Sequence, residues 1–224
     1  ALKSDQDGIT LGTDNYDHVP ALSLFVQNDS RNAVYPTDGF FLEIEGGKWG
    51  VFGGDADFWR VDIDVRRYMD APFLNQRHSF AISSFASLVS GIPGETIPRF
   101  QEFFVGGTNL RGFQVAGIGP RDTDTDDALG GNLYYTGTAE LRFPLGLPED
   151  LRIFGRTFVD AGNLYEIDVN GPTLDEGDYI RVSAGVGISW LSPLGPLALD
   201  FAQAIRKDDR DETELFRISF GTRF

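Results

Sequence analysis

The segment from Gly106 to Phe113 holds the residues whose types and spacing best suit specific chemistry. It reads Gly-Gly-Thr-Asn-Leu-Arg-Gly-Phe, so one arginine, Arg111, stands between the pair Gly106-Gly107 and the next glycine, Gly112. Glycine permits sharp backbone turns, which would carry a single guanidinium group to a defined place. Because a guanidinium group binds carboxylates through two parallel hydrogen bonds, we expect Arg111 to meet acidic side chains.

The other residues do not support an enzyme. The two histidines, His18 and His78, stand in no catalytic or metal-binding motif, and neither cysteine nor a Gly-x-Ser-x-Gly nucleophile motif occurs. The aspartates from Asp122 to Asp127 lack the glycine and glutamate of an EF-hand calcium loop, so we expect a solvated acidic loop. A net charge of -15 opposes a nucleic-acid partner. We therefore expect a non-enzymatic protein with no cofactor and no nucleic-acid partner.

The elements that must position Arg111 are β-strands, because the strongest pattern in the chain is an alternation of apolar and polar residues. In the last segment one face would carry Phe216, Ile218, Phe220 and Phe224, and the other Arg217, Ser219, Gly221 and Arg223. One face suits lipid and the other suits water. The 27 glycines and 19 phenylalanines also favour twisted sheet over helix.

About nine such segments occur, near residues 20-28, 39-48, 57-69, 78-90, 132-144, 150-162, 180-191, 196-206 and 214-224. Most are near the roughly 9–11 residues that cross a bilayer when tilted, and they exceed the roughly 5–6 residues usual in soluble strands. A tenth strand could lie within residues 1-13. The fold class predicted is all-β, an antiparallel transmembrane β-barrel, although soluble up-and-down barrels share the pattern. Since bacterial barrels have even strand numbers, we expect part of a larger barrel.

The connections also resemble those of a barrel, with tight turns at one rim and longer loops at the other. Residues 144–148 and 192–196 form tight turns, whereas residues 91-131 form the one long connection. Unstructured connections of that length are usually functional or disordered. We therefore treat residues 1-224 as one barrel domain and place its functional question in residues 91-131.

Several motifs in order resemble the BamA-type outer-membrane assembly factors. They are Gly106-Gly107, Leu110-Arg111-Gly112-Phe113, Gly130-Gly131-Asn132, Glu140-Leu141-Arg142-Phe143-Pro144, Phe158-Val159-Asp160-Ala161-Gly162, Ser192-Pro193-Leu194-Gly195-Pro196 and Phe220-Gly221-Thr222-Arg223-Phe224. The resemblance covers about residues 20-224. It implies the C-terminal strands of a barrel of roughly sixteen strands, integral to the bacterial outer membrane.

The resemblance also implies partners for Arg111. In that family the Arg-Gly-aromatic loop folds back into the barrel lumen, and its arginine contacts a glutamate and an aspartate on the two strands that follow. Those residues are here Glu140 and Asp160. The alternation independently places Glu140 on the lumen face with Arg142, and Asp160 on that face with Arg156. Arg111 would then either merely pin the loop or, by pinning it, keep the lumen plugged.

The C-terminal residues Ile218, Phe220 and Phe224 resemble the signal by which outer-membrane barrels are recognised, and they equally suit a lipid-facing strand end. The function implied is assembly and insertion of β-barrel proteins into the outer membrane. The partners implied are unfolded outer-membrane protein clients, outer-membrane lipids and accessory lipoproteins bound through N-terminal domains that these residues do not include. Two alternatives remain: a passive pore or protein-secretion conduit, and the barrel anchor of a patatin-like lipase.

Overall fold

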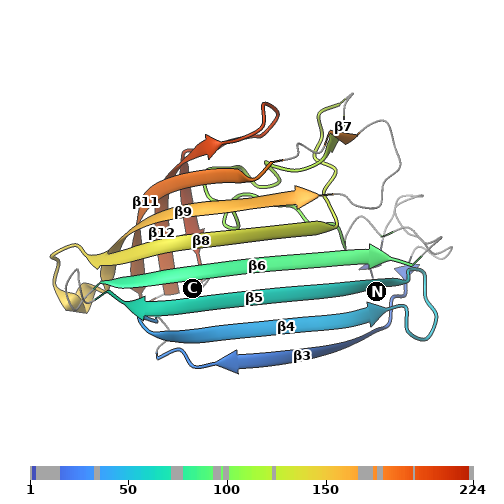
Figure 1. Cartoon of the computed structure of the whole chain (residues 1–224), viewed down its shortest axis with the longest axis horizontal. Coiled ribbons are helices and arrows are strands. Elements are labelled where there is room, and N and C mark those ends of the chain that lie inside the picture. The colour runs from blue at the N-terminus through green and yellow to red at the C-terminus, as the bar shows by residue number, and fades with distance from the viewer. Residues whose placement is uncertain are drawn as a thin grey trace.

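One antiparallel sheet of nine strands dominates the computed structural model, which describes residues 2–3, 16–32, 36–71, 78–92, 97, 101–122, 125–165, 174–175, 179–193 and 195–221. The strands are β3 (Ala21–Asp29), β4 (Gly39–Trp49), β5 (Phe58–Asp70), β6 (Ser79–Gly91), β8 (Leu133–Pro144), β9 (Ile153–Tyr165), β11 (Arg181–Ser192), β12 (Gly195–Arg206) and β13 (Phe216–Phe220). Each pairs with the next one in this series. The sheet curls, so that its C-terminal strands lie behind its middle strands (Figure 1).

All nine predicted segments are strands of this sheet, so the prediction of an all-β antiparallel fold is confirmed. The last strand is shorter than predicted: the alternation suggested residues 214-224, whereas β13 runs from Phe216 to Phe220. Residues 222–224 lie outside the described part of the chain. The extra strand considered within residues 1-13 also falls mostly outside it, and the described residues there form only β1 (Leu2–Lys3).

The remaining elements belong to the connections. β1 pairs with β2 (Tyr16–Asp17), β7 (Arg121–Asp122) pairs with β10 (Leu174–Asp175), and η2 (Glu149–Leu151) is a single 3-10 turn. Among the described residues no helix combines the length and apolar character needed to cross a membrane.

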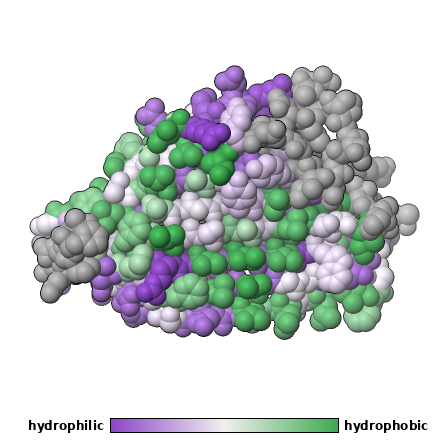
Figure 2. All heavy atoms as spheres, viewed as in Figure 1, coloured by the Kyte–Doolittle hydropathy of each residue, from purple (hydrophilic) through white to green (hydrophobic). Residues whose placement is uncertain are grey.

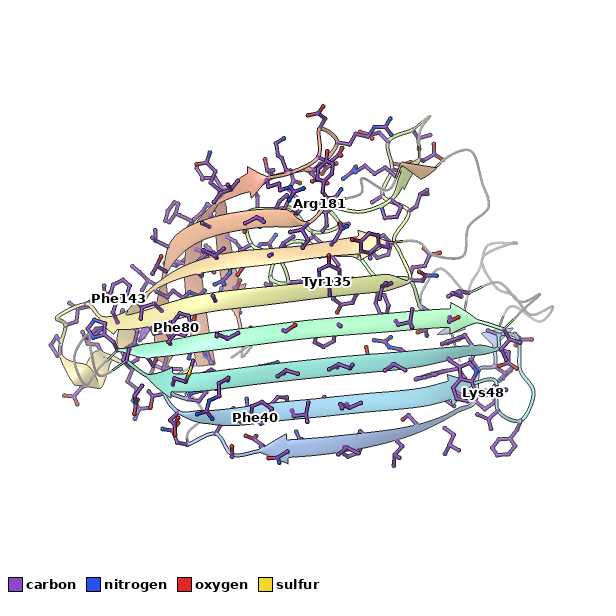
Figure 3. All side chains as sticks on the ribbon, viewed as in Figure 1. Phe40, Lys48, Phe80, Tyr135, Phe143 and Arg181 are labelled. Carbon is purple, nitrogen blue, oxygen red and sulfur yellow. The ribbon has the colours of Figure 1, made fainter. Side chains whose placement is uncertain are left out.

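The two faces of the sheet differ in the way the alternation predicted. In β5, the outward residues Trp59 and Ile63 are 53% and 37% exposed, whereas the inward Asp62 and Asp64 are held in ion pairs by arginines of the same strand. Apolar side chains run across the outer face of the sheet (Figure 2). Phe80 and Phe143 lie near the end of the sheet that carries the short turns (Figure 3), which suits an aromatic girdle at a membrane surface.

Residues 101–122 and 125–131, here called the lumen loop, lie against the inward face of the sheet and bring their own apolar core. Val105, Leu110 and Phe113 are fully buried, and they pack with strand residues that include Phe58 and Val89. Such burial of large side chains stabilises the loop by about 1.5–3 kcal/mol for each side chain. The main apolar core among the described residues therefore sits between loop and sheet, at the end with the long connections.

Candidate functional site

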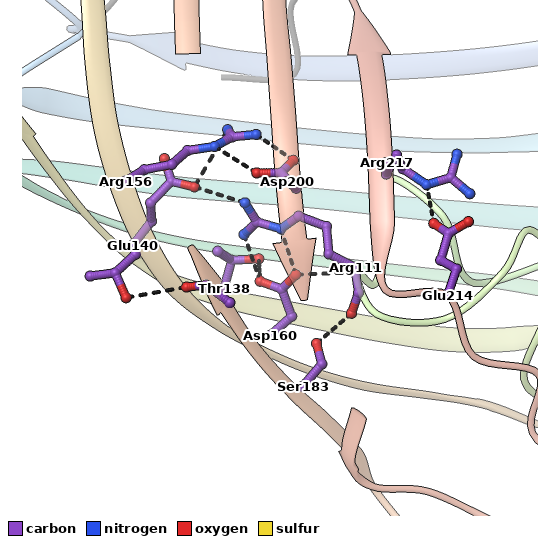
Figure 4. Close-up of polar contacts among 11 residues, drawn as sticks. Arg111, Thr138, Glu140, Arg156, Asp160, Ser183, Asp200, Glu214 and Arg217 are labelled. Atoms are coloured by element: carbon purple, nitrogen blue, oxygen red, sulfur yellow. Dashed lines mark hydrogen bonds and ion pairs between the residues drawn. The ribbon is translucent and has the colours of Figure 1, made fainter. Parts of the chain in front are cut away.

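Arg111 binds two carboxylates on the inward face of the sheet (Figure 4). Its Nε and Nη2 donate to the two carboxylate oxygens of Asp160 at 2.7 and 2.8 Å, and its backbone N–H donates to Asp160 Oδ2 at 3.2 Å. Its Nη1 donates to Glu140 Oε2 at 3.0 Å. The residues that were assigned to this contact from sequence thus lie together, Glu140 on β8 and Asp160 on β9.

The glycines of the motif let the backbone reach this place. Gly106 has φ +128°, and a Cβ there would lie 1.8 Å from the backbone oxygen of Gln114. Gly112 has φ +89°, and a Cβ there would lie 3.0 Å from the Cβ of Ser183 on β11. The Ser183 hydroxyl also donates to the Arg111 carbonyl oxygen. A side chain at Gly106 would therefore distort the loop itself, whereas one at Gly112 would push the loop away from the strands that hold Arg111.

A phenylalanine lies beneath the guanidinium group. The Arg111 Cζ is 3.3 Å from the centre of the Phe158 ring, which is 3% exposed. An aromatic face attracts a cation, and the attraction is largest where water is excluded. The guanidinium group is therefore held by carboxylates in its plane and by a ring on one face.

The ion pairs continue along the wall. Glu140 Oε1 accepts from Arg142 Nε at 2.8 Å, and Arg156 lies 3.7 Å from Glu140 while it binds Asp200 of β12 at 3.0 and 2.5 Å. The resulting lumen network has six members: Arg111, Arg142, Arg156, Glu140, Asp160 and Asp200. None is more than 8% exposed. Three positive and three negative groups cancel, so the desolvated charges are internally balanced.

The network differs from the sequence prediction in extent. Asp200 was not singled out, although alternation with its outward neighbours Leu199 and Phe201 could have placed it on the inward face. Phe158 and Ser183 were also missed as contacts of Arg111, because their role depends on where the loop folds. These contacts carried no local sequence signal.

The other predicted site residues occupy two different settings. Leu110 and Phe113 are buried in the apolar core of the lumen loop, beside Arg111. Ile218 and Phe220 are 50% and 80% exposed on the outward face of β13, and Phe224 lies outside the described residues. The motif and the C-terminal residues are therefore separate sites.

A polar cavity of about 250 Å³ lies beside the network. Its lining includes the loop residues Thr108 and Asn109 and the wall residues Asp64, Arg66 and Ser83. Within the described ranges, no three histidine, aspartate or glutamate side chains gather in a way that could hold a metal ion. Every carboxylate of the network is engaged by a guanidinium group, so the arrangement is suited to holding the loop in place.

Comparison with known proteins gives a consistent result. The Omp85 superfamily domain matches residues 8–224. The chain is 34% identical over 199 residues to the outer membrane protein assembly factor BamA of Neorickettsia risticii, covering 89% of this chain and 26% of that protein. It is 31% identical over 225 residues to BamA of Neisseria meningitidis serogroup B, covering 88% and 28%. The chain therefore spans roughly a quarter of the length of these relatives.

A solved structure is also similar. It is the crystal structure of BamA from Haemophilus ducreyi lacking POTRA domains 1–3, with a TM-score of 0.78 and 27% sequence identity. The match covers 88% of this chain and 41% of that one. The nine-stranded sheet thus corresponds to part of a larger β-barrel.

Proposed function

Because this chain belongs to the Omp85 superfamily, we propose that it is the barrel segment through which its protein assembles and inserts other β-barrel proteins into the outer membrane. The chain is an integral outer-membrane β-barrel segment. Residues 1–224 would form one partial barrel domain with residues 91–131 as its lumen-directed loop. The activity would be non-enzymatic, with unfolded outer-membrane proteins as clients and lipids around the outward face. Accessory lipoproteins would bind parts of the protein that this chain does not span.

The observation that carries this proposal is the locked lumen loop. Arg111 is bound by Asp160 and Glu140, and the apolar core around Leu110 and Phe113 packs between the loop and the wall. A pore would need the space that these side chains fill. If the loop fills the lumen of the whole barrel in the same way, clients would meet the strand edges of the barrel and its lipid-facing surface. An unpaired strand edge presents N–H and C=O groups on which another strand can form.

A reconstituted assay tests the proposal. The full-length protein in liposomes should accelerate the folding of a purified, urea-unfolded outer-membrane barrel, followed by protease resistance of the client. Arg111→Ala should reduce this acceleration strongly. Arg67→Ala is the control. The Arg67 side chain is half exposed, and its ion pair with Asp38 is loose, with 3.8 Å between nitrogen and oxygen, so this pair is expected to contribute little.

Two outcomes would favour the alternatives. A steady conductance of the unmodified protein in planar bilayers, with no effect on client folding, would indicate a pore or secretion conduit. Ester hydrolysis by the full-length protein would indicate the anchor of a lipase. Client folding unaffected by Arg111→Ala would remove the lumen loop from the proposed function.

A further inference from the structure

The residues just before the last strand pair with the lumen loop and not with the sheet. Gln114 N–H donates to the Glu212 carbonyl oxygen at 2.9 Å, and Glu212 N–H donates to the Gly117 carbonyl oxygen at 2.9 Å. Glu214 N–H donates to the Gly112 carbonyl oxygen at 3.1 Å. These bonds join residues 112–117 to residues 212–214, here called the terminal segment, in a short antiparallel pairing centred on Phe113 and Thr213.

The chain then changes partner within one residue. The Leu215 carbonyl oxygen accepts from Ala202 N–H of β12 at 3.0 Å, and from Phe216 onward the chain pairs with β12 as strand β13. β13 is an end strand of the described sheet, and it has only five residues. A strand of five residues is held by few ladder hydrogen bonds, so it opens more readily than a long strand. The pairing of the terminal segment thus lies where an opening of β13 would begin.

The loop is itself firmly fixed at this place. Phe113 and Ile118 are 0% and 2% exposed, and Arg111 is bound by the lumen network. Arg121 of the loop also binds the terminal segment, with its Nη1 3.1 Å from Glu212 Oε1. An anchored element of this kind can restrain a mobile neighbour, whereas a loose loop could not.

A second connection lies deeper in the lumen. Arg156 bridges Glu140, which holds the loop, and Asp200 of β12. Asp200 stands directly opposite Arg217 of β13, and Arg217 Nε donates to the carboxylate of Glu214 in the terminal segment. The same network that binds Arg111 therefore reaches the last hairpin.

We propose that the lumen loop is a brace for the last strand. While residues 112–117 pair with residues 212–214, the start of β13 is fixed relative to the barrel wall, and β13 stays on β12. When that pairing opens, the start of β13 is no longer fixed to the loop, and β13 separates from β12 more readily. The lumen loop thereby controls how readily the end of the sheet opens. This inference concerns the internal mechanics of the barrel and stands whether or not the protein assembles other barrels.

Hydrogen exchange of the full-length protein in lipid nanodiscs tests the brace. Glu212→Pro removes the N–H that donates to Gly117, four residues before β13 begins. Glu212→Ala is the matched control, because it keeps this N–H while it also removes the contact with Arg121. We expect the amides of residues 216–220 to exchange faster in Glu212→Pro than in Glu212→Ala by roughly fivefold or more, the effect of losing one ordinary hydrogen bond. Amides of β5 should exchange equally in both variants.

A reversible crosslink provides a second measurement if the proline variant does not fold. The chain has no cysteine, and Gln114 and Glu212 face each other across the pairing, so Gln114→Cys with Glu212→Cys places one disulfide there. The oxidised form should exchange the β13 amides more slowly than the same protein after reduction. Equal exchange in the oxidised and reduced forms would overturn the proposal, as would equal exchange in Glu212→Pro and Glu212→Ala.

Discussion

Replacing Asp160 by alanine should destabilise the barrel more than any other single carboxylate change in the lumen network. Asp160 is 1% exposed and accepts four hydrogen bonds, three from Arg111 and one of 2.9 Å from the hydroxyl of Thr138. Removing one partner of a buried ion pair leaves an uncompensated charge and costs about 3–5 kcal/mol. Glu140 would remain to bind Arg111 through one oxygen, so the lower half of that range is expected.

Urea unfolding of the full-length protein in detergent micelles, with proteolysis of the lumen loop as a second probe, measures this effect. Asp38→Ala is the control, since the Asp38 side chain is 58% exposed and its loss should cost about 1 kcal/mol or less. Arg111→Ala and the double variant complete a double-mutant cycle. The double variant should be more stable than additivity predicts by about 1–3 kcal/mol, because both charges are then gone. The reasoning would be refuted if Asp160→Ala lowered the free energy of unfolding by less than about 1 kcal/mol and the effects of Asp160→Ala and Arg111→Ala were additive in the double variant.

Three further outcomes follow from single contacts. Phe158→Leu removes the ring beneath Arg111 and should cost about 0.5–2 kcal/mol in the same unfolding assay, a loss that should disappear when Arg111 is already alanine. Gly112→Ala should cost more than Gly146→Ala, by about 1–2 kcal/mol, because both glycines have positive φ but only Gly112 has Ser183 nearby. At the rim, burial by itself would raise the pKa of Asp208, but hydrogen bonds from the Arg210 N–H and the Tyr179 hydroxyl lower it. The stability that the Asp208 carboxylate contributes is present above the ordinary aspartate pKa and is lost as pH falls through the lowered pKa. Hydrogen exchange of the amides of residues 207–211, corrected for intrinsic rates, should therefore become faster at acid pH. In Asp208→Asn this increase at acid pH should be absent.

The sequence predicted the strands well because their signal is local. Residues that alternate between lipid and lumen repeat every two positions, and this pattern located all nine strands within a few residues. It also set the face of Glu140 and Asp160, while the resemblance to BamA-type assembly factors, now confirmed, supplied their pairing with Arg111. Both kinds of information were needed for the site.

What could not be predicted depends on where the lumen loop comes to rest. The contact of Phe158 with Arg111 arises only after the loop has folded onto the wall, and so does the hydrogen bond of Ser183. The start of the last strand was misplaced for the same reason. Glu214 has the register of the lipid-facing Phe216 and so already breaks the alternation, and its backbone donates to Gly112 of the loop. A distant segment thus outcompeted the sheet for these residues.

The cancellation of charge in the lumen network has a consequence for how the barrel responds to electric fields. A transmembrane potential does work on net charge, about 2.3 kcal/mol for each elementary charge moved through 100 mV. Six balanced groups that move together feel almost none of it. If Arg111 leaves the network, two arginines and three carboxylates stay on the wall with a sum of -1, and Arg111 takes its charge of +1 away. Within the network, only the separation of Arg111 from its carboxylates is therefore sensitive to voltage.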